Sequence, residues 1–420
     1  CGRAAWLRAH SPPHAMARRM AAAMAAVVAA GQGDDAKLPS MVWMSPVLAG
    51  GGYSSEAIAY ALALDESYAA AGRAAFGLAE FAEHESSDFI RGLPDRVLQV
   101  LKRGLGAAQS RRRSFDVAVC HSTPDVWHAD GAFGWGRVAP CPPAGASFAV
   151  GRTMYETDRL PDSWVSRIEQ MDEVWVPSAF AVDQFVASGV SRERVVVVPE
   201  AVDTELFDPL QHAPLDVSAS TGKRPGDFVF LSVFKWERRK GWDVLLRGYF
   251  EEFTADDPVI LYVKTRPFYS DSDFDAQIRS FAASLAGARA PLARYAVLSE
   301  DVPLRSLPRL YRAADAFVLP SRGEGWGRPH VEAMAMGLPV IATNWSGSTE
   351  FLTDANSLPL RIDGLSDVVD GLPGHRWAEP SLSHLRELMR WATGHRAEVV
   401  EIGGRAREDM IRRFSPRAVV

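Results

Sequence analysis

Short apolar and β-branched runs alternate with helical patterns along the chain from Met41 onward. This alternation is typical of a parallel β-sheet whose two faces are covered by helices. Residues 209–227, a polar stretch with several prolines and glycines, interrupt the alternation and indicate a linker. With 420 residues, the chain also exceeds the roughly 250–300 residues that one hydrophobic core supports. We therefore predict an α/β protein with two doubly wound, Rossmann-like domains.

The predicted strands fall on both sides of the linker. Those of the first domain are Met41–Ser45, Ala75–Phe81, Val117–Cys120, Ser147–Val150, Val174–Val176 and Val195–Val198. Those of the second domain are Phe228–Val233, Val259–Lys264, Tyr295–Leu298, Ala316–Leu319 and Pro339–Thr343. We expect the first domain to span residues 41–208 and the second residues 228–404. A C-terminal helix within residues 405–420 is expected to return toward the first domain and to be cut short.

The first 40 residues differ in composition from the rest of the chain. A basic start at residues 16–20 is followed by an Ala/Val run to Ala30, which imitates a targeting leader. An Ala-rich extension translated from an upstream region explains the same composition. The missing initiator methionine indicates a fragment or a misplaced start. We expect a cytoplasmic protein, or an organelle-targeted one if residues 16–30 are a leader.

Charge and composition exclude several classes of protein. The formal net charge is -6 and no basic stripe occurs, so nucleic acid is not an expected partner. The three cysteines are too few for a disulfide framework and match no zinc spacing, which predicts reduced thiols. No apolar run reaches the roughly 18–20 residues of a membrane span. Peripheral association with a membrane stays compatible with the sequence.

Two glutamates stand between a predicted strand and a predicted helix. The strand Ala316–Leu319 is followed by a loop with three glycines that contains Glu324, and Pro329 opens a short helix that ends at Gly337. Glu332 is placed in the first turn of that helix. Because ligands bind beyond the carboxyl ends of parallel strands, both carboxylates can face one ligand and accept hydrogen bonds from sugar hydroxyls. A solvated loop residue and a helix-dipole contact explain the same spacing.

A basic loop follows the first strand of the second domain. The segment from Lys235 to Lys240 carries four cations in six residues and ends at Gly241. Cations at the carboxyl end of a strand favour a site for a diphosphate leaving group. A solvated basic surface is the simpler alternative.

These segments resemble a known family. The run from Glu324 through Glu332 to Thr343 resembles the E-x7-E signature of family 4 (glycosyl transferases group 1) retaining glycosyltransferases with the GT-B fold, and Lys235–Gly241 resembles their basic loop. Further matches in the family's order begin at Met171, Val197 and Leu310. The resemblance implies two Rossmann-like domains that face a cleft, with the acceptor on the first and the nucleotide-sugar donor on the second.

The resemblance also assigns roles to single residues. It implies that Glu332 binds the donor ribose and Glu324 a hydroxyl of the donor sugar, while Lys235 and Lys240 neutralise the diphosphate. The family usually has arginine at position 235, so the charge is kept but the bidentate fork is lost. The backbone amides of three loop residues would complete the anion site. These residues are Gly325, Trp326 and Gly327, and the Trp326 side chain is also expected at the ligand.

The acceptor half is less specific. Gly51 and Gly52 fit the family's glycine loop near the donor phosphates and the acceptor, although a tight turn explains them as well. Where many relatives carry a histidine, this chain has Glu156, which leaves the polar partner of the reacting sugar open. His121 is the other candidate, although a histidine that caps a helix or loop is the more ordinary explanation.

The expected activity is metal-independent transfer of a sugar from a nucleoside-diphosphate sugar to a glycan, lipid or small molecule, with retention of configuration and no further cofactor. Asp271-Ser-Asp273 and Asp273-Phe-Asp275 match a manganese-binding D-x-D pattern, but helix capping explains them more simply. Two alternatives stay open: a catalytically silent GT-B protein that binds sugar nucleotides or glycans, and an epimerase or hydrolase of the same architecture.

Overall fold

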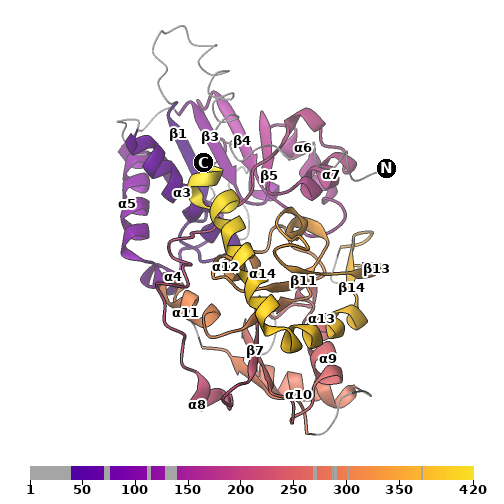
Figure 1. Cartoon of the computed structure of the whole chain (residues 1–420). Coiled ribbons are helices and arrows are strands. Elements are labelled where there is room, and N and C mark those ends of the chain that lie inside the picture. Colours follow the sequence, from indigo (N-terminus) through magenta and orange to yellow (C-terminus); the bar gives the residue numbers. More distant parts are fainter. Residues whose placement is uncertain are drawn as a thin grey trace. The chain divides into compact units, whose positions relative to one another are not determined.

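The computed structural model describes residues 39–70, 76–110, 115–127, 140–267, 272–285, 287, 291–300, 302–369 and 372–420. The chain divides into two compact units, each with its own parallel sheet (Figure 1). Unit 1 contains Cys1–Met154, Leu160–Asp203 and Ile411–Val420, and unit 2 contains Tyr155–Arg159 and Thr204–Met410. The chain therefore changes unit after Met154, Arg159, Asp203 and Met410.

The sheet of unit 1 has the strand order β2-β1-β3-β4-β5-β6, and all neighbouring strands are parallel. Its strands are β1 (Met41–Ser45), β2 (Gly77–Glu80), β3 (Val117–His121), β4 (Phe148–Arg152), β5 (Glu173–Val176) and β6 (Val195–Val197). Its helices are α3 (Gly52–Ala70), α4 (Ser87–Gly92), α5 (Asp95–Ser110), η1 (Pro124–Val126), α6 (Asp162–Ile168), α7 (Ala179–Ala187), η2 (Arg192–Arg194) and α15 (Pro416–Val419). Buried β1 and β3 lie at the centre of this core.

The main sheet of unit 2 has the order β12-β11-β10-β7-β8-β9 and is also parallel throughout. Its strands are β7 (Phe228–Lys235), β8 (Val259–Arg266), β9 (Tyr295–Leu298), β10 (Ala316–Leu319), β11 (Val340–Thr343) and β12 (Leu358–Leu360). A separate antiparallel hairpin joins β13 (Ile362–Asp367) to β14 (Arg376–Pro380). The predicted linker 209–227 belongs to this unit and contains the short helix α8 (Ser218–Thr221).

Helices connect most of these strands. They are η3 (Arg238–Lys240), α9 (Trp242–Glu252), α10 (Phe274–Ser284), η4 (Leu304–Ser306), α11 (Leu307–Tyr311), α12 (Arg328–Ala335), η5 (Ser346–Glu350), α13 (Leu382–Gly394) and α14 (Arg396–Asp409). A π-helical stretch, η6 (Met410–Phe414), follows α14 at the point where the chain returns to unit 1.

The predicted fold class is confirmed, because each domain is a Rossmann-like parallel sheet with helical crossovers. Every strand predicted from the sequence forms, with ends that shift by one or two residues at most sites. The sequence patterns missed β12 and the β13–β14 hairpin, since these segments are short and β13 is largely exposed. Asp273 caps α10 by accepting from the Ala276 amide, as predicted, whereas Asp271 lies outside the described residues.

The prediction of reduced thiols is wrong for two of the three cysteines. Cys120, in β3, forms a disulfide with Cys141, and both residues are buried in unit 1. The cysteines are 21 residues apart in the chain, and only the fold brings them together. Cys1 and the possible leader lie outside the described residues.

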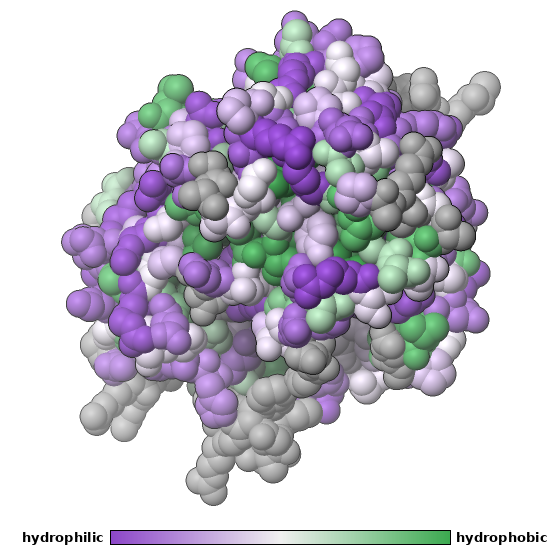
Figure 2. All heavy atoms as spheres, turned by 90° about the horizontal axis from the view of Figure 1, so that it is seen from below, coloured by the Kyte–Doolittle hydropathy of each residue, from purple (hydrophilic) through white to green (hydrophobic). Residues whose placement is uncertain are grey.

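The surface seen from below is largely hydrophilic, with hydrophobic residues gathered toward its middle (Figure 2). Among the described residues, the exposed large hydrophobic side chains are Val186, Leu210, Leu365, Val369, Val400 and Ile411. None of the helices in the described ranges is both long enough and apolar enough to cross a bilayer.

Candidate functional site

The loop between β10 and α12 depends on close backbone packing. A Cβ atom added at Gly323 would lie 2.0 Å from the Glu156 carbonyl oxygen, and one at Gly347 would lie 2.0 Å from that of Gly325. Gly327 adopts a left-handed conformation (φ 113°) as the residue that precedes α12. Any larger side chain at these positions would displace the loop. The glycines therefore fix the path of the chain that carries Glu324.

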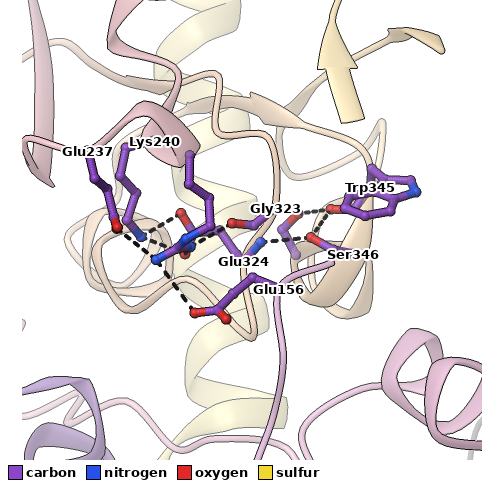
Figure 3. A network of polar contacts seen from close by, with 9 residues as sticks. Glu156, Glu237, Lys240, Gly323, Glu324, Trp345 and Ser346 are labelled. Atoms are coloured by element: carbon purple, nitrogen blue, oxygen red, sulfur yellow. Dashed lines mark hydrogen bonds and ion pairs between the residues drawn. The ribbon is translucent and has the colours of Figure 1, made fainter. Parts of the chain in front are cut away.

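Glu324 is buried with a fully engaged carboxylate (Figure 3). Lys240 Nζ donates to both of its oxygens at 2.8 Å, and Arg239 approaches one of them at 3.4 Å. The backbone amide of Glu324 donates to Ser346 Oγ at 2.9 Å. Burial would raise the pKa of Glu324, but Lys240 and Arg239 outweigh it and hold that pKa at about 2. Glu324 is therefore a fixed carboxylate at neutral pH.

Arg239 is the centre of this network and was not singled out from the sequence. Its guanidinium donates to the Gly323 carbonyl at 2.7 Å and to Glu237 at 2.8 Å, and it lies 3.5 Å from Glu156. Burial would lower the pKa of Arg239, but the neighbouring Glu156 and Glu324 carboxylates outweigh burial and raise that pKa above its ordinary value. The run of cations in the basic loop indicated this position without distinguishing it from its neighbours.

Glu332 is the fifth residue of α12, just past the first turn, because the helix begins at Arg328, one residue before Pro329. It is buried, and the Tyr311 hydroxyl donates to Glu332 Oε2 at 2.8 Å. Burial raises the pKa of Glu332, although Arg328 and the Tyr311 hydrogen bond oppose that shift. Tyr311 comes from α11 and was missed, because nothing in the spacing of the two residues links them.

The Trp326 side chain, which was expected at the ligand, packs inside unit 2. The indole is 1% exposed and contacts Phe351 edge to face at 5.0 Å between ring centroids. His330, in α12, is also buried, and burial lowers its pKa to about 4. The groups of this loop that could bind an anion are the backbone amides of Gly325, Trp326 and Gly327, which precede α12.

Glu156 lies in unit 2, in the segment Tyr155–Arg159. Its carboxylate is 3.5 Å from Arg239, and its carbonyl oxygen packs against Gly323. The structure thus joins Glu156, which was predicted with the acceptor half, to Lys240 and Glu324 of the predicted donor half in one network. Gly325 packs beside this network against Gly347. Lys235 is the last residue of β7, in the same unit.

The remaining predicted residues belong to unit 1. Gly51 and Gly52 stand at the start of α3, where the amides of Gly50 and Gly51 donate to Ser54 Oγ. A Cβ at Gly52 would meet no atom within 4 Å, so the space beside this residue is open.

His121 does not cap a helix or loop, which corrects the simpler prediction for it. Its Nδ1 accepts from Trp43 Nε1 at 3.0 Å, so the Nε2 hydrogen is directed at Glu56, 2.9 Å away. Arg152 binds the other oxygen of Glu56 at 2.6 Å. Burial would raise the pKa of Glu56, but Arg152 and His121 bring it down to about 2. These residues are fully buried and tie the middle of β1 and the ends of β3 and β4 to α3.

No group of three or more His, Cys, Asp or Glu residues in the described part of the chain is arranged to hold a metal ion. The acidic and basic groups of the site instead pair with one another.

Residues 225–362, which contain Lys240, Glu324 and Glu332, match the family described as glycosyl transferases group 1. The chain contains a group 1 glycosyltransferase domain. The D-inositol 3-phosphate glycosyltransferase of Acidothermus cellulolyticus is 29% identical over 230 residues, which cover 53% of this chain and 47% of that protein. A GDP-mannose-dependent alpha-(1-6)-phosphatidylinositol monomannoside mannosyltransferase of Mycolicibacterium smegmatis is 26% identical over 220 residues, 50% of this chain and 54% of the relative. The chain thus matches about half the length of these relatives.

The group 1 domain and the rest of the chain share their fold with solved structures. HepE of Anabaena, crystallised with UDP and glucose, superposes with a TM-score of 0.62 over 91% of this chain and 97% of its own, at 13% identity. The similarity in fold over nearly the whole chain confirms the GT-B architecture predicted from the sequence.

Proposed function

We propose that the chain is a retaining glycosyltransferase that moves a sugar from a nucleoside-diphosphate sugar to a hydroxyl-bearing acceptor. The observation that carries this proposal is the arrangement of Glu324, Lys240 and Glu332 after β7 and β10 in a group 1 domain. The carboxyl ends of parallel strands are where such folds bind ligands. The names of the relatives, which include inositol phosphate and mannosyl transferases, agree with this class of reaction.

The donor site divides into a sugar part and a nucleotide part. We assign Glu324 to a hydroxyl of the donor sugar, since its ionised oxygens can accept from a hydroxyl while Lys240 holds them in place. Glu332 is assigned to the ribose hydroxyls, with Tyr311 fixing one of its oxygens. Nothing in these contacts selects between uracil, guanine and adenine.

Departure of the diphosphate is the step that the cations would assist. As the bond from the sugar to the phosphate oxygen breaks, negative charge grows on the diphosphate and positive charge on the sugar ring. Lys235, Lys240 and the amides before α12 would stabilise the leaving group, so the reaction we propose takes no metal ion and no further cofactor. Retention of configuration is proposed from the family resemblance.

The acceptor is assigned to unit 1, at the glycine turn before α3. The open space at Gly52 favours this turn, whereas His121 has both ring nitrogens engaged and is buried. We therefore propose that the glycine turn contacts the acceptor, and that His121 only holds Trp43 and Glu56 in place. The acceptor class stays a glycan, a lipid or a small molecule.

The position of Glu156 favours a second candidate, a binding protein without catalysis. Its carboxylate is paired with Arg239 at the place where many relatives have a histidine. Release of nucleoside diphosphate from a sugar nucleotide in the presence of a panel of acceptors would exclude that candidate.

The test of the proposal is binding of nucleoside diphosphates, measured as thermal shift and by titration calorimetry with UDP, GDP and ADP. One of the three should raise the melting temperature of the wild type. Lys240→Ala and Glu332→Gln should each weaken that ligand about ten- to a hundredfold, because each removes a charge-assisted contact. Lys102→Ala, on the exposed side of α5 in unit 1, is the control. Wild-type affinity in both site variants would contradict the assignment.

A further inference from the structure

Two cations end neighbouring strands of unit 2. Lys235 is the last residue of β7 and Arg266 the last residue of β8, and the two are direct register partners in the parallel pairing. Register partners on adjacent strands project to the same face of a sheet, with the strands about 4.8 Å apart. The fold thus sets a guanidinium beside the ammonium at the carboxyl edge of the sheet.

This pair lies beside the candidate donor site. In the sheet order, β7 stands between β10, which leads to Glu324, and β8, which ends at Arg266. The turn that carries Lys240 follows directly from Lys235. A ligand above the ends of β10 and β7 therefore reaches the end of β8 by extending across one further strand.

The charges around this pair differ from those around the other cations of the site. Arg239 is surrounded by Glu156, Glu237 and Glu324, whereas Arg266 forms no ion pair with any residue that the structure describes. Burial lowers the pKa of Lys235, and Arg266 lowers it further by like-charge repulsion. Lys240 and Arg239 act in the same direction, and Glu237 opposes them. Four cations, Lys235, Arg239, Lys240 and Arg266, therefore lie near one another at these strand ends, where an anion would be attracted.

We propose that Arg266 binds the donor diphosphate together with Lys235 and supplies the two-point guanidinium contact that a lysine at position 235 cannot make. Lysine is a point charge, while the planar fork of arginine matches two phosphate oxygens at once. This inference rests on the proposed function and adds a residue outside the matched motifs.

The experiment compares Arg266→Ala, Lys235→Arg and the double variant by calorimetric titration with UDP and GDP at about 50 and 200 mM salt. We expect Arg266→Ala to bind the preferred diphosphate about tenfold more weakly, with a smaller dependence on salt. Adding Lys235→Arg should restore most of that loss, because it returns the fork to the neighbouring strand. Arg309→Ala, an exposed arginine on α11, is the matched control.

Two results would overturn the inference while the proposed function stands. One is an Arg266→Ala affinity within twofold of wild type when Lys240→Ala loses binding in the same assay. The other is a double variant that binds no more tightly than Arg266→Ala. A wild type that binds neither these diphosphates nor ADP would instead defeat the proposed function. Arg266 is exposed, so circular dichroism should show that its variant folds normally.

Discussion

Glu324 and Glu332 are eight residues apart, yet their surroundings push their pKa values in opposite directions. Both carboxyl groups are buried. Glu324 faces two cations that keep it ionised. Glu332 instead has the neutral Tyr311 hydroxyl at 2.8 Å, and burial raises its pKa by more than Arg328 lowers it. Of the two, Glu332 is therefore the carboxylate that takes up a proton at the higher pH.

Replacing Tyr311 with phenylalanine should make nucleotide binding more sensitive to acid. The Tyr311 hydroxyl favours the ionised form of Glu332, so its loss raises the pKa of Glu332 further. Protonated Glu332 accepts ribose hydroxyls poorly, and affinity should fall at a higher pH than in the wild type. We expect about fivefold weaker binding at neutral pH, from a loss of about 1 kcal/mol.

Titrations of the preferred diphosphate between pH 5 and 8 measure this effect. Tyr295→Phe is the control, because the Tyr295 hydroxyl binds Asp275 in the same unit and has no contact with Glu332. Parallel curves for Tyr311→Phe and wild type across this range would show that the hydroxyl does not set the ionisation of Glu332.

The sequence predicted which loops carry the site but only part of what fills it. Lys240 and Glu324 were predicted because each lies in a motif of its own. Arg239, Tyr311 and Arg266 were not, since their roles come from partners on other elements: the Gly323 carbonyl, Glu332 and the register of β7 with β8. Such pairings depend on how strands order themselves in a sheet, which local patterns do not encode.

At the scale of elements, a single carboxyl group connects β2 with the glycine turn before α3. Glu80 Oε1 accepts from the Leu48 amide at 2.9 Å, while Oε2 is buried and has no hydrogen-bond partner among the described residues. Burial raises the pKa of Glu80 to about 7, and Glu85 and Glu83 add to that rise. The turn is therefore held by a group that is protonated in part at neutral pH.

Glu80→Gln should stabilise the protein more at pH 8 than at pH 5. The folded pKa is raised above the ordinary value of 4.5, so the folded state holds more protons than the unfolded state between about pH 4.5 and 7. Stability from this group is present below that window and is lost as pH rises through it. Glutamine keeps the acceptor for Leu48 without the charge, and we expect a gain of about 1 kcal/mol at pH 8 after allowance for solvent screening.

Chemical denaturation of both proteins at pH 5 and pH 8 provides the measurement. Glu66→Gln, an exposed substitution on α3, is the control. An advantage for Glu80→Gln that does not grow with pH would contradict the raised pKa.

The hairpin β13–β14 shows why some elements escape prediction. Its first strand is mostly exposed, so it lacks the apolar run that marks a buried strand. The hairpin is attached instead by Arg322, whose guanidinium contacts Glu379 in β14 and Asp243 in α9. Arg322 thus adds polar contacts to β14, whose Trp377 and Ala378 are buried, while β13 stays largely exposed.

At the scale of the whole molecule, each unit has its own parallel sheet, and this much was predictable. Strands buried on both faces appear as continuous apolar runs, as in β3, β10 and β11. The disulfide was not predictable, because Cys120 and Cys141 have no diagnostic spacing and meet only after β3 is placed.

We expect two calorimetric transitions, one for each unit, of which one responds to loss of the disulfide and the other to nucleoside diphosphate. The Cys120–Cys141 bond lies in unit 1 and closes a separation of 21 residues, so Cys120→Ser with Cys141→Ser should cost that unit about 3 kcal/mol. A nucleoside diphosphate at about a hundred times its Kd should raise the other transition, by about 2.7 kcal/mol in stability. One transition that both treatments move by the same amount would contradict this division.

The order of the chain does not follow the division into units. Tyr155–Arg159 follows the first sheet's β4 but contributes Glu156 to Arg239, Thr157 to His375 and Asp158 to Arg376 in unit 2. If two related genes recombined once at residues 209–227, the second sheet would come from one gene and the pentapeptide Tyr155–Arg159 from the other. Working chimaeras should therefore arise when the pentapeptide is inherited with the second sheet and residues 411–420 are inherited with the first.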